Sequence, residues 1–169
     1  DLGSGNLLLE TDPNGNTIHY EYDAFGRISK EIRPYDDSPF PTVSYLYLTD
    51  GTAPEGVRVS QRTTSGQNET LAVYSFTDGF GRTIPSRAPA ENPAQQIVTN
   101  TFDDNRGLVS QQSVPHLAPF SSDYTTPLPN IRSTNTSYDP LERPIRIQNP
   151  DTTSRTTDYY HWQETYSDE

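Results

Sequence analysis

Cysteine and methionine are both absent from the 169 residues of this chain. Without cysteine the chain can form no disulfide and offers no thiol nucleophile and no thiolate metal ligand. Because no initiator methionine is present, we expect the chain to be a fragment or a processed product. No apolar run approaches the roughly 18 residues that a membrane-spanning helix requires, and no signal peptide is recognisable. We therefore expect no membrane insertion.

Apolar and basic residues are also scarce. Hydrophobic residues make up 30% of the chain, against roughly 45–50% in an ordinary globular domain. Twelve basic residues face 23 acidic ones, which gives a net charge of −11. This balance disfavours nucleic acid and anionic membranes as partners, since both need a basic protein surface. It is typical of a soluble surface. We expect no cofactor. The sequence contains no EF-hand-like run, but weak Ca²⁺ binding to its carboxylates remains an alternative.

Tyrosine is abundant instead, with 11 residues, and it alternates with polar residues in short runs. Ile18, Tyr20 and Tyr22 share one face of such a run. A tyrosine ring can cover a sheet while its hydroxyl stays in water. No window has helical periodicity, and proline or glycine interrupts every long one. The sequence therefore predicts an all-β fold of antiparallel hairpins, with strands near 18–22, 43–47, 57–59, 71–73, 96–102, 108–114, 135–138, 145–148 and 155–166.

Polar, turn-forming stretches separate these runs. Asp12-Pro13-Asn14-Gly15-Asn16 contains Asn-Gly, a strong hairpin signal. Three longer stretches, 33–41, 49–56 and 117–130, read as loops. The third is proline-rich, so we expect it to be the most flexible or exposed of them.

The most informative feature is a turn that occurs four times, at 20–28, 76–84, 102–109 and 138–145. An aspartate opens each copy and can accept backbone N–H bonds, and a following glycine tolerates positive φ. An arginine after the glycine can return to the aspartate or lie over a tyrosine ring. The residues expected to build these turns are Tyr22, Asp23, Gly26, Arg27, Asp78, Gly81, Arg82, Asp104, Gly107, Tyr138, Asp139 and Arg143.

The four aspartates are 55, 26 and 35 residues apart, so the hairpin is retained while the inserted loops vary. We expect one module over 1–169, with hairpin units near 17–33, 71–87, 97–114 and 134–148 and a C-terminal strand region at 154–166.

The repeat resembles the YD repeat of the Rhs family, roughly Tyr-Asp-x-x-Gly-Arg followed by an apolar strand. Two copies are sharp and two are degraded, with Glu142 in place of glycine and Leu108 in place of arginine. The family includes bacterial polymorphic toxins, the B and C components of insecticidal toxin complexes, wall-associated proteins and teneurins. The resemblance implies an extended, curved sheet wound into a hollow spiral shell with inward tyrosines.

The family's self-cleaving aspartates lie in two closely spaced Asp-Pro-x-Gly motifs. In this chain Asp12-Pro13 and Asp139-Pro140 are far apart, so the resemblance does not extend to protease activity.

Residue patterns for other chemistry are weak. His19, His116 and His161 are far apart, and the adjacent carboxylates at 36–37 and 103–104 point away from each other on an extended chain. We therefore expect no enzymatic activity. The aromatic residues Tyr159, Tyr160 and Trp162 favour a half-buried strand, with a ligand-stacking patch for carbohydrate as the alternative.

The leading hypothesis is a structural module of a secreted or cell-surface protein. Its strand edges would pair with copies of itself to form a filament, because exposed edges readily add another strand. One alternative is a section of a hollow shell that encapsulates a toxin, where the partners are neighbouring repeats of a longer parent chain. Another is a module that binds glycans or a partner surface through exposed aromatic rings.

Overall fold

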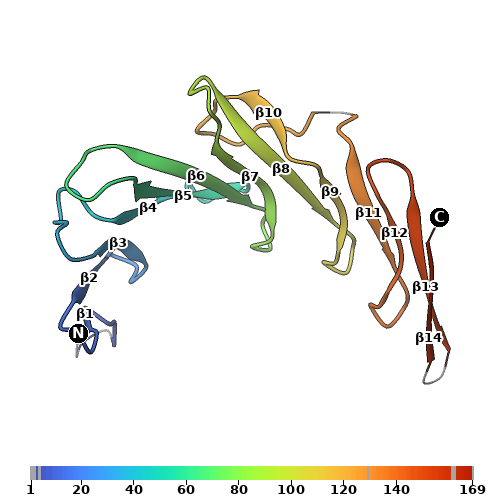
Figure 1. The fold of residues 1–169 in the computed structure, drawn as a ribbon, viewed down its shortest axis with the longest axis horizontal. Coiled ribbons are helices and arrows are strands. Elements are labelled where there is room, and N and C mark those ends of the chain that lie inside the picture. The colour runs from blue at the N-terminus through green and yellow to red at the C-terminus, as the bar shows by residue number, and fades with distance from the viewer. Residues whose placement is uncertain (1–2, 4, 129, 161–162, 169) are drawn as a thin grey trace. The chain divides into compact units, whose positions relative to one another are not determined.

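The structure is a computed structural model that describes residues 3, 5–128, 130–160 and 163–168. In these ranges the chain contains fourteen strands and no helix (Figure 1), which confirms the all-β fold. The strands are β1 (Leu9–Thr11), β2 (Thr17–Tyr22), β3 (Ile28–Ile32), β4 (Val43–Leu48), β5 (Glu55–Arg62), β6 (Thr70–Thr77), β7 (Thr83–Pro89), β8 (Gln95–Asp103), β9 (Val109–Ser113), β10 (His116–Pro119), β11 (Ser133–Tyr138), β12 (Pro144–Gln148), β13 (Ser154–Tyr160) and β14 (Gln163–Asp168).

The strand order in the sheet follows the order along the chain. Each strand from β1 to β9 neighbours the next, β11 follows β9, and the order continues to β14, while β10 pairs with β8. Such sequential pairing needs only hairpin connections, and antiparallel strands can be joined by short turns. The chain divides into two compact units, Asp1–Tyr74 and Ser75–Glu169. They are described separately below. One module over 1–169 stays a prediction.

The first unit has a thin core. In it β4 pairs regularly with β5, from Val43 opposite Gln61 to Leu48 opposite Gly56. The valine and tyrosines that alternate along β4 are only half-buried. Among the apolar side chains described in this unit, Ile32 and Tyr74 are buried, with 8% and 5% of their surfaces exposed. The stability of such a sheet comes more from contacts between side chains on neighbouring strands than from a thick hydrophobic core. Strand β5 begins at Glu55, so the loop expected over 49–56 ends two residues earlier than expected.

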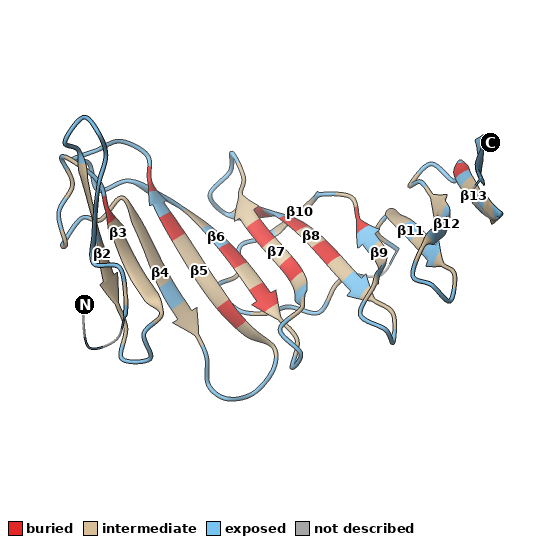
Figure 2. Cartoon of the chain, turned by 90° about the horizontal axis from the view of Figure 1, so that it is seen from below, coloured by how far each residue is buried: buried red, intermediate tan, exposed pale blue. Residues whose placement is uncertain are grey.

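The second unit buries polar side chains on one face of its sheet. On β7 and β8 the buried positions alternate, as expected for one covered face. Figure 2 shows them as short bands on these strands. Arg87 and Gln96 are each only 2% exposed, and Asn100 is 3% exposed. A buried polar face of this kind must be hydrogen-bonded to remain stable.

The stretch 117–130, expected to be flexible or exposed, consists mostly of exposed residues, and it also lies over this face. Ser121 donates its backbone N–H to Gln96 Oε1 over 3.0 Å. The ring of Tyr124 meets the buried ring of Phe76 edge to face, with 6.0 Å between the ring centres. Because these partners lie at least 25 residues away in the chain, local composition could not reveal them.

This stretch also begins with an unexpected strand, β10, which pairs with Gln95–Val98 of β8. The reason is a difference in length. β8 has nine residues and β9 only five, and β9 pairs with the Thr101–Asp103 end. Pro115 between β9 and β10 has no N–H to donate, so pairing stops there and resumes at His116.

The single strand expected over 155–166 is also wrong, because the chain doubles back. Strands β13 and β14 form an antiparallel pair, from Arg155 opposite Asp168 to Tyr160 opposite Gln163. The sequence Tyr-Tyr-His-Trp-Gln carries strand-favouring aromatics but no glycine, asparagine or proline to mark a turn.

Candidate functional site: the recurring turn

The recurring turn is a five-residue loop. The aspartate at position 1 forms hydrogen bonds with the backbone of positions 3, 4 and 5. In the first copy, Asp23 donates its N–H to the carbonyl of Arg27 over 2.8 Å, and Gly26 donates to the Asp23 carbonyl over 3.0 Å. The carboxylate oxygen Oδ1 of Asp23 accepts the N–H groups of Phe25 and Arg27, each at 2.9 Å. Gly26 at position 4 has a φ of 75°. One carboxylate thus satisfies the donors that a tight turn leaves unpaired.

The other three copies have the same geometry. Asp78, Asp104 and Asp139 each accept two backbone N–H groups through Oδ1, at 2.8–3.0 Å. Each also closes the turn by the same two backbone bonds. Glu142, in the position of glycine, keeps the positive φ, at 65°. The substitutions at Leu108 and Glu142 therefore leave the turn intact.

Two further turns share this backbone pattern, although sequence analysis did not group them with the repeat. In the turn from Asp12 to Asn16, Asp12 Oδ1 accepts two backbone N–H groups, and the Asn16 amide donates to Asp12 Oδ2 over 2.8 Å. In the turn from Asn149 to Thr153, the same two backbone bonds form, and Thr152 has a φ of 79°. The usable signal was an aspartate or asparagine five positions before the first residue of the next strand.

The arginine at position 5 makes two contacts at once. Its Nε donates to Oδ2 of the turn aspartate, at 2.7 Å for Arg27, 2.8 Å for Arg82 and 2.7 Å for Arg143. The guanidinium of Arg27 also lies over the Tyr47 ring, with 3.9 Å from its carbon to the ring centre, and that of Arg143 lies 4.2 Å from the centre of Tyr159. Both alternatives expected for this arginine are thus present together.

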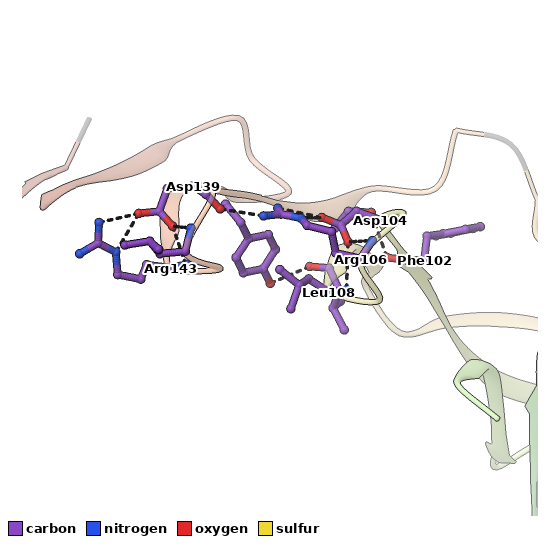
Figure 3. Close-up of polar contacts among 10 residues, drawn as sticks. Phe102, Asp104, Arg106, Leu108, Asp139 and Arg143 are labelled. Carbon is purple, nitrogen blue, oxygen red and sulfur yellow. Dashed lines mark hydrogen bonds and ion pairs between the residues drawn. The ribbon is translucent and has the colours of Figure 1, made fainter. Parts of the chain in front are cut away.

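In the third copy, which has no arginine at position 5, the aspartate is bound by an arginine at another position. Leu108 occupies position 5, and Arg106 at position 3 supplies the guanidinium, with Nε and Nη2 at 3.1 and 3.0 Å from Asp104 Oδ2. Figure 3 shows Arg106 between Asp104 and Asp139. Its Nη1 donates to the Asp139 carbonyl over 2.7 Å, which joins this turn to the next one.

Tyrosine hydroxyls bind the chain as it leaves the turn. Tyr47 donates to the carbonyl of Ile28 over 2.9 Å, Tyr138 to Val109 over 2.9 Å, and Tyr159 to Pro144 over 3.2 Å. Each acceptor stands two residues after the position with positive φ. Tyr22 makes the same contact, at 2.7 Å, with Leu7, two residues after Gly5. The copies at Asp23, Asp104 and Asp139 therefore combine a hairpin turn with a tyrosine from a neighbouring strand.

The turn aspartates are held as carboxylates. Hydrogen bonds from the Arg82 side chain and backbone hold the pKa of Asp78 below its ordinary value. The Leu108 backbone N–H does the same to the pKa of Asp104, and the Asn16 amide to the pKa of Asp12. Asp78 in turn raises the pKa of Arg82. A carboxylate that accepts several N–H bonds is stabilised in its charged form.

The other predicted site residues are the aromatic residues of the expected ligand-stacking patch, and the described ones do not share one face of their strand. Tyr159 is half-buried under Arg143, while Tyr160 is 72% exposed. Neighbours on a strand point to opposite faces, and Trp162 and His161 lie outside the described residues, so the stacking patch stays a prediction. Within the described ranges, no three His, Asp or Glu side chains are grouped to hold a metal ion. No helix in that part of the chain is long and apolar enough to cross a membrane.

Antiparallel hairpins with one recurring turn define a structural repeat module. The family model for the RHS repeat matches residues 2–37, a stretch that contains the turns at Asp12 and Asp23. The stretch 2–37 is thus similar to the RHS repeat, in agreement with the resemblance to the YD repeat that the turn motifs indicated.

Among solved structures, the chain is similar to the crystal structure of TcdB2-TccC3. The two share 18% sequence identity and a TM-score of 0.73, over 96% of this chain and 11% of that one. The chain therefore has the fold of a small part of that much longer protein. No curated protein matches it in sequence.

Proposed function

We propose that this structural Rhs module is a section of the wall of a larger shell, one that encloses a polypeptide cargo such as a toxin outside the cell or at its surface. The observation that carries the proposal is the match to TcdB2-TccC3, where nearly the whole chain aligns with about a tenth of a much longer protein. Neighbouring repeats of the same parent chain are then its partners.

The geometry of the strands supports this arrangement. In the described sheet, β1 neighbours only β2, and β14 neighbours only β13. All three residues of β1 and all six of β14 are exposed. A strand with an unpaired side offers its N–H and C=O groups to any further strand. In a longer chain of the same repeat, the next hairpin would satisfy them.

The same free edges support a second candidate, the extracellular filament. Here β14 of one copy pairs with β1 of the next, and head-to-tail contacts that do not close give a fibre. The two candidates differ in concentration dependence, because only the filament needs a second copy of the chain.

Sedimentation velocity over a wide range of protein concentration, with negative-stain electron microscopy of the same samples, separates the candidates. The wall proposal predicts particles that do not lengthen as concentration rises, and hollow particles only from a longer parent chain. Regular fibres that grow with concentration would overturn it. A Thr165→Lys variant, in the exposed strand β14, is the matched control, because an edge lysine should block strand addition and leave the other strands in place.

A further inference from the structure

Position 3 of the recurring turn carries an exposed, large apolar side chain in three of the four copies. Phe25, Phe80 and Leu141 occupy it in the first, second and fourth copies, and they are 83%, 86% and 72% exposed. A single exposed apolar residue is ordinary in a folded protein. Its recurrence at one position of a repeat requires a physical reason.

The geometry of the turn does not supply that reason. Asn14 and Asp151 occupy position 3 in the two further turns that share the backbone pattern. Each of these two turns lies at the other end of a strand, β2 or β12, from a copy with an apolar residue. The apolar residues are therefore specific to one end of these strands and are not a requirement of the backbone conformation.

In the second unit these turns lie along one end of the sheet. The turns at 78–82, 104–108 and 139–143 join β6 to β7, β8 to β9 and β11 to β12. Because neighbouring strands are antiparallel, every second connection in the sheet lies at the same end. Figure 1 shows the three loops together at the lower end of these strands. We call this end, defined by the three turns, the repeat rim.

Arginines lie beside the apolar side chains. The guanidinium carbon of Arg82 is 5.2 Å from the centre of the Phe80 ring, and that of Arg27 is 5.1 Å from the centre of Phe25. In the third turn Arg106 itself stands at position 3 and is exposed. Apolar side chains next to arginines are typical of proteins at a membrane–water interface, where the apolar group enters the acyl boundary and the guanidinium stays among the headgroups.

The spacing of the turns favours a lipid surface over a protein surface. Phe80 and Leu141 are four strand-to-strand steps apart, or about 19 Å, with Arg106 in the turn between them. The core of a protein interface is a contiguous, closely packed apolar patch, which single side chains at this distance do not provide. A bilayer has no fixed surface shape, so each side chain can enter it separately.

Charge determines which kind of lipid fits. The charged side chains of the repeat rim, together with the adjoining Asp103, are Asp78, Asp103, Asp104, Asp139 and Glu142 against Arg82, Arg106 and Arg143. Carboxylates thus outnumber guanidiniums, and the net charge of −11 on the whole chain has the same sign. An anionic bilayer is repelled by this charge, whereas a zwitterionic bilayer is not.

From this arrangement we propose that the repeat rim docks on the surface of a zwitterionic lipid bilayer, with Phe80 and Leu141 as the side chains that enter it. The contact is peripheral, because only the tips of turns reach the lipid. It does not rest on the shell-wall function, since all three turns belong to the second unit of this chain.

The test is flotation of the full chain with phosphatidylcholine vesicles over a range of lipid concentration. The double variant Phe80→Asn/Leu141→Asn removes both apolar side chains and keeps the turns, because Asn14 already occupies position 3 of such a turn. We expect the double variant to melt as the wild-type chain does and to bind at least tenfold more weakly. Vesicles that contain phosphatidylserine should bind the wild-type chain less well, most clearly at low salt.

Leu71→Asn is the matched control. Leu71 is 53% exposed but lies at the start of β6, away from the turn at 78–82, so its replacement should leave binding unchanged. The proposal is wrong if the wild-type chain does not bind phosphatidylcholine vesicles, or if binding survives the double variant or needs anionic lipid. Sedimentation without lipid covers the other occupant. Self-association that the double variant abolishes, without any binding to vesicles, would identify a second copy of the chain as the partner and overturn the proposal.

Discussion

The guanidinium carbon of Arg27 lies 3.9 Å from the centre of the Tyr47 ring, while the hydroxyl of the same tyrosine donates to the carbonyl of Ile28. The ring and the hydroxyl of Tyr47 thus bind consecutive residues of the chain leaving the turn. Arg143, Pro144 and Tyr159 repeat this arrangement in the second unit. A tyrosine in the next strand therefore couples one hairpin to its neighbour.

Replacing Tyr47 by phenylalanine separates these two contacts. The ring and its cation–π contact stay, and the hydrogen bond to Ile28 is lost, which should cost about 1 kcal/mol of the free energy of unfolding. Urea denaturation of the variant measures this difference. Tyr45→Phe is the control, because the Tyr45 hydroxyl has no hydrogen bond among the described contacts, and its removal should cost less. Equal losses in the two variants would mean that the Ile28 bond contributes nothing.

Position 4 of the recurring turn gives a second prediction. Gly81 has a φ of 78°, and a Cβ added there meets no atom within 4 Å. Gly81→Ala therefore tests backbone strain alone and should cost about 1–2 kcal/mol. The reverse change, Glu142→Gly, should stabilise the fourth turn by up to about 1 kcal/mol, because Glu142 already has positive φ. Thermal melting of the two variants should show a lower melting temperature for Gly81→Ala and a higher one for Glu142→Gly. A lower melting temperature for Glu142→Gly would contradict the argument.

Glu142 also shows how far the sequence could predict this structure. The turn was recognisable because its bonds join residues within five positions of each other, and Asp139 opens it whether glycine or glutamate follows at position 4. The strands followed from alternation along single runs. In contrast, the cover of 117–130 over Gln96 depends on a contact across 25 residues, and the loop after β3 is held by the hydrogen bond from Ser65 to Asp36, 29 residues apart. Neither contact leaves a local pattern.

The turn carboxylates predict how stability depends on pH. The pKa of Asp78 is lowered in the folded chain by hydrogen bonds from Arg82, so the folded state favours the charged form. Its contribution is fully present above the unfolded value near 3.8 and is lost as the pH falls through the lower folded pKa. Asp104 and Asp12 act in the same direction. We therefore expect stability to be level at neutral pH and to decrease below about pH 4.

Asp78→Asn isolates one turn in this measurement. The amide oxygen has two lone pairs and can still accept the two backbone N–H groups, but the charge is gone. The variant should be less stable than wild type at pH 7, and the difference should shrink in acid. Melting curves from pH 7 down to pH 3 show both effects. A difference that is constant with pH would exclude a role for the Asp78 charge.

Arg87 gives the last prediction, because it is a buried arginine with neutral partners. It is 2% exposed, and it donates to Gln96 Oε1 over 3.2 Å and to the Thr125 hydroxyl. Its Nε has no partner among the described residues, and burial lowers the pKa of its guanidinium. A buried charge without a carboxylate is costly.

Methionine fills a similar space without charge, so Arg87→Met should leave global stability unchanged or raise it, whereas Arg87→Ala should lower it through the cavity that it leaves. The contact with Thr125 is lost in both variants, and the covering segment should then be cut faster by chymotrypsin at Tyr124. Denaturation and limited proteolysis of the two variants measure these effects separately. If Arg87→Met is strongly destabilised, the guanidinium itself holds the 117–130 segment on the sheet, and its two hydrogen bonds outweigh the cost of burying the charge.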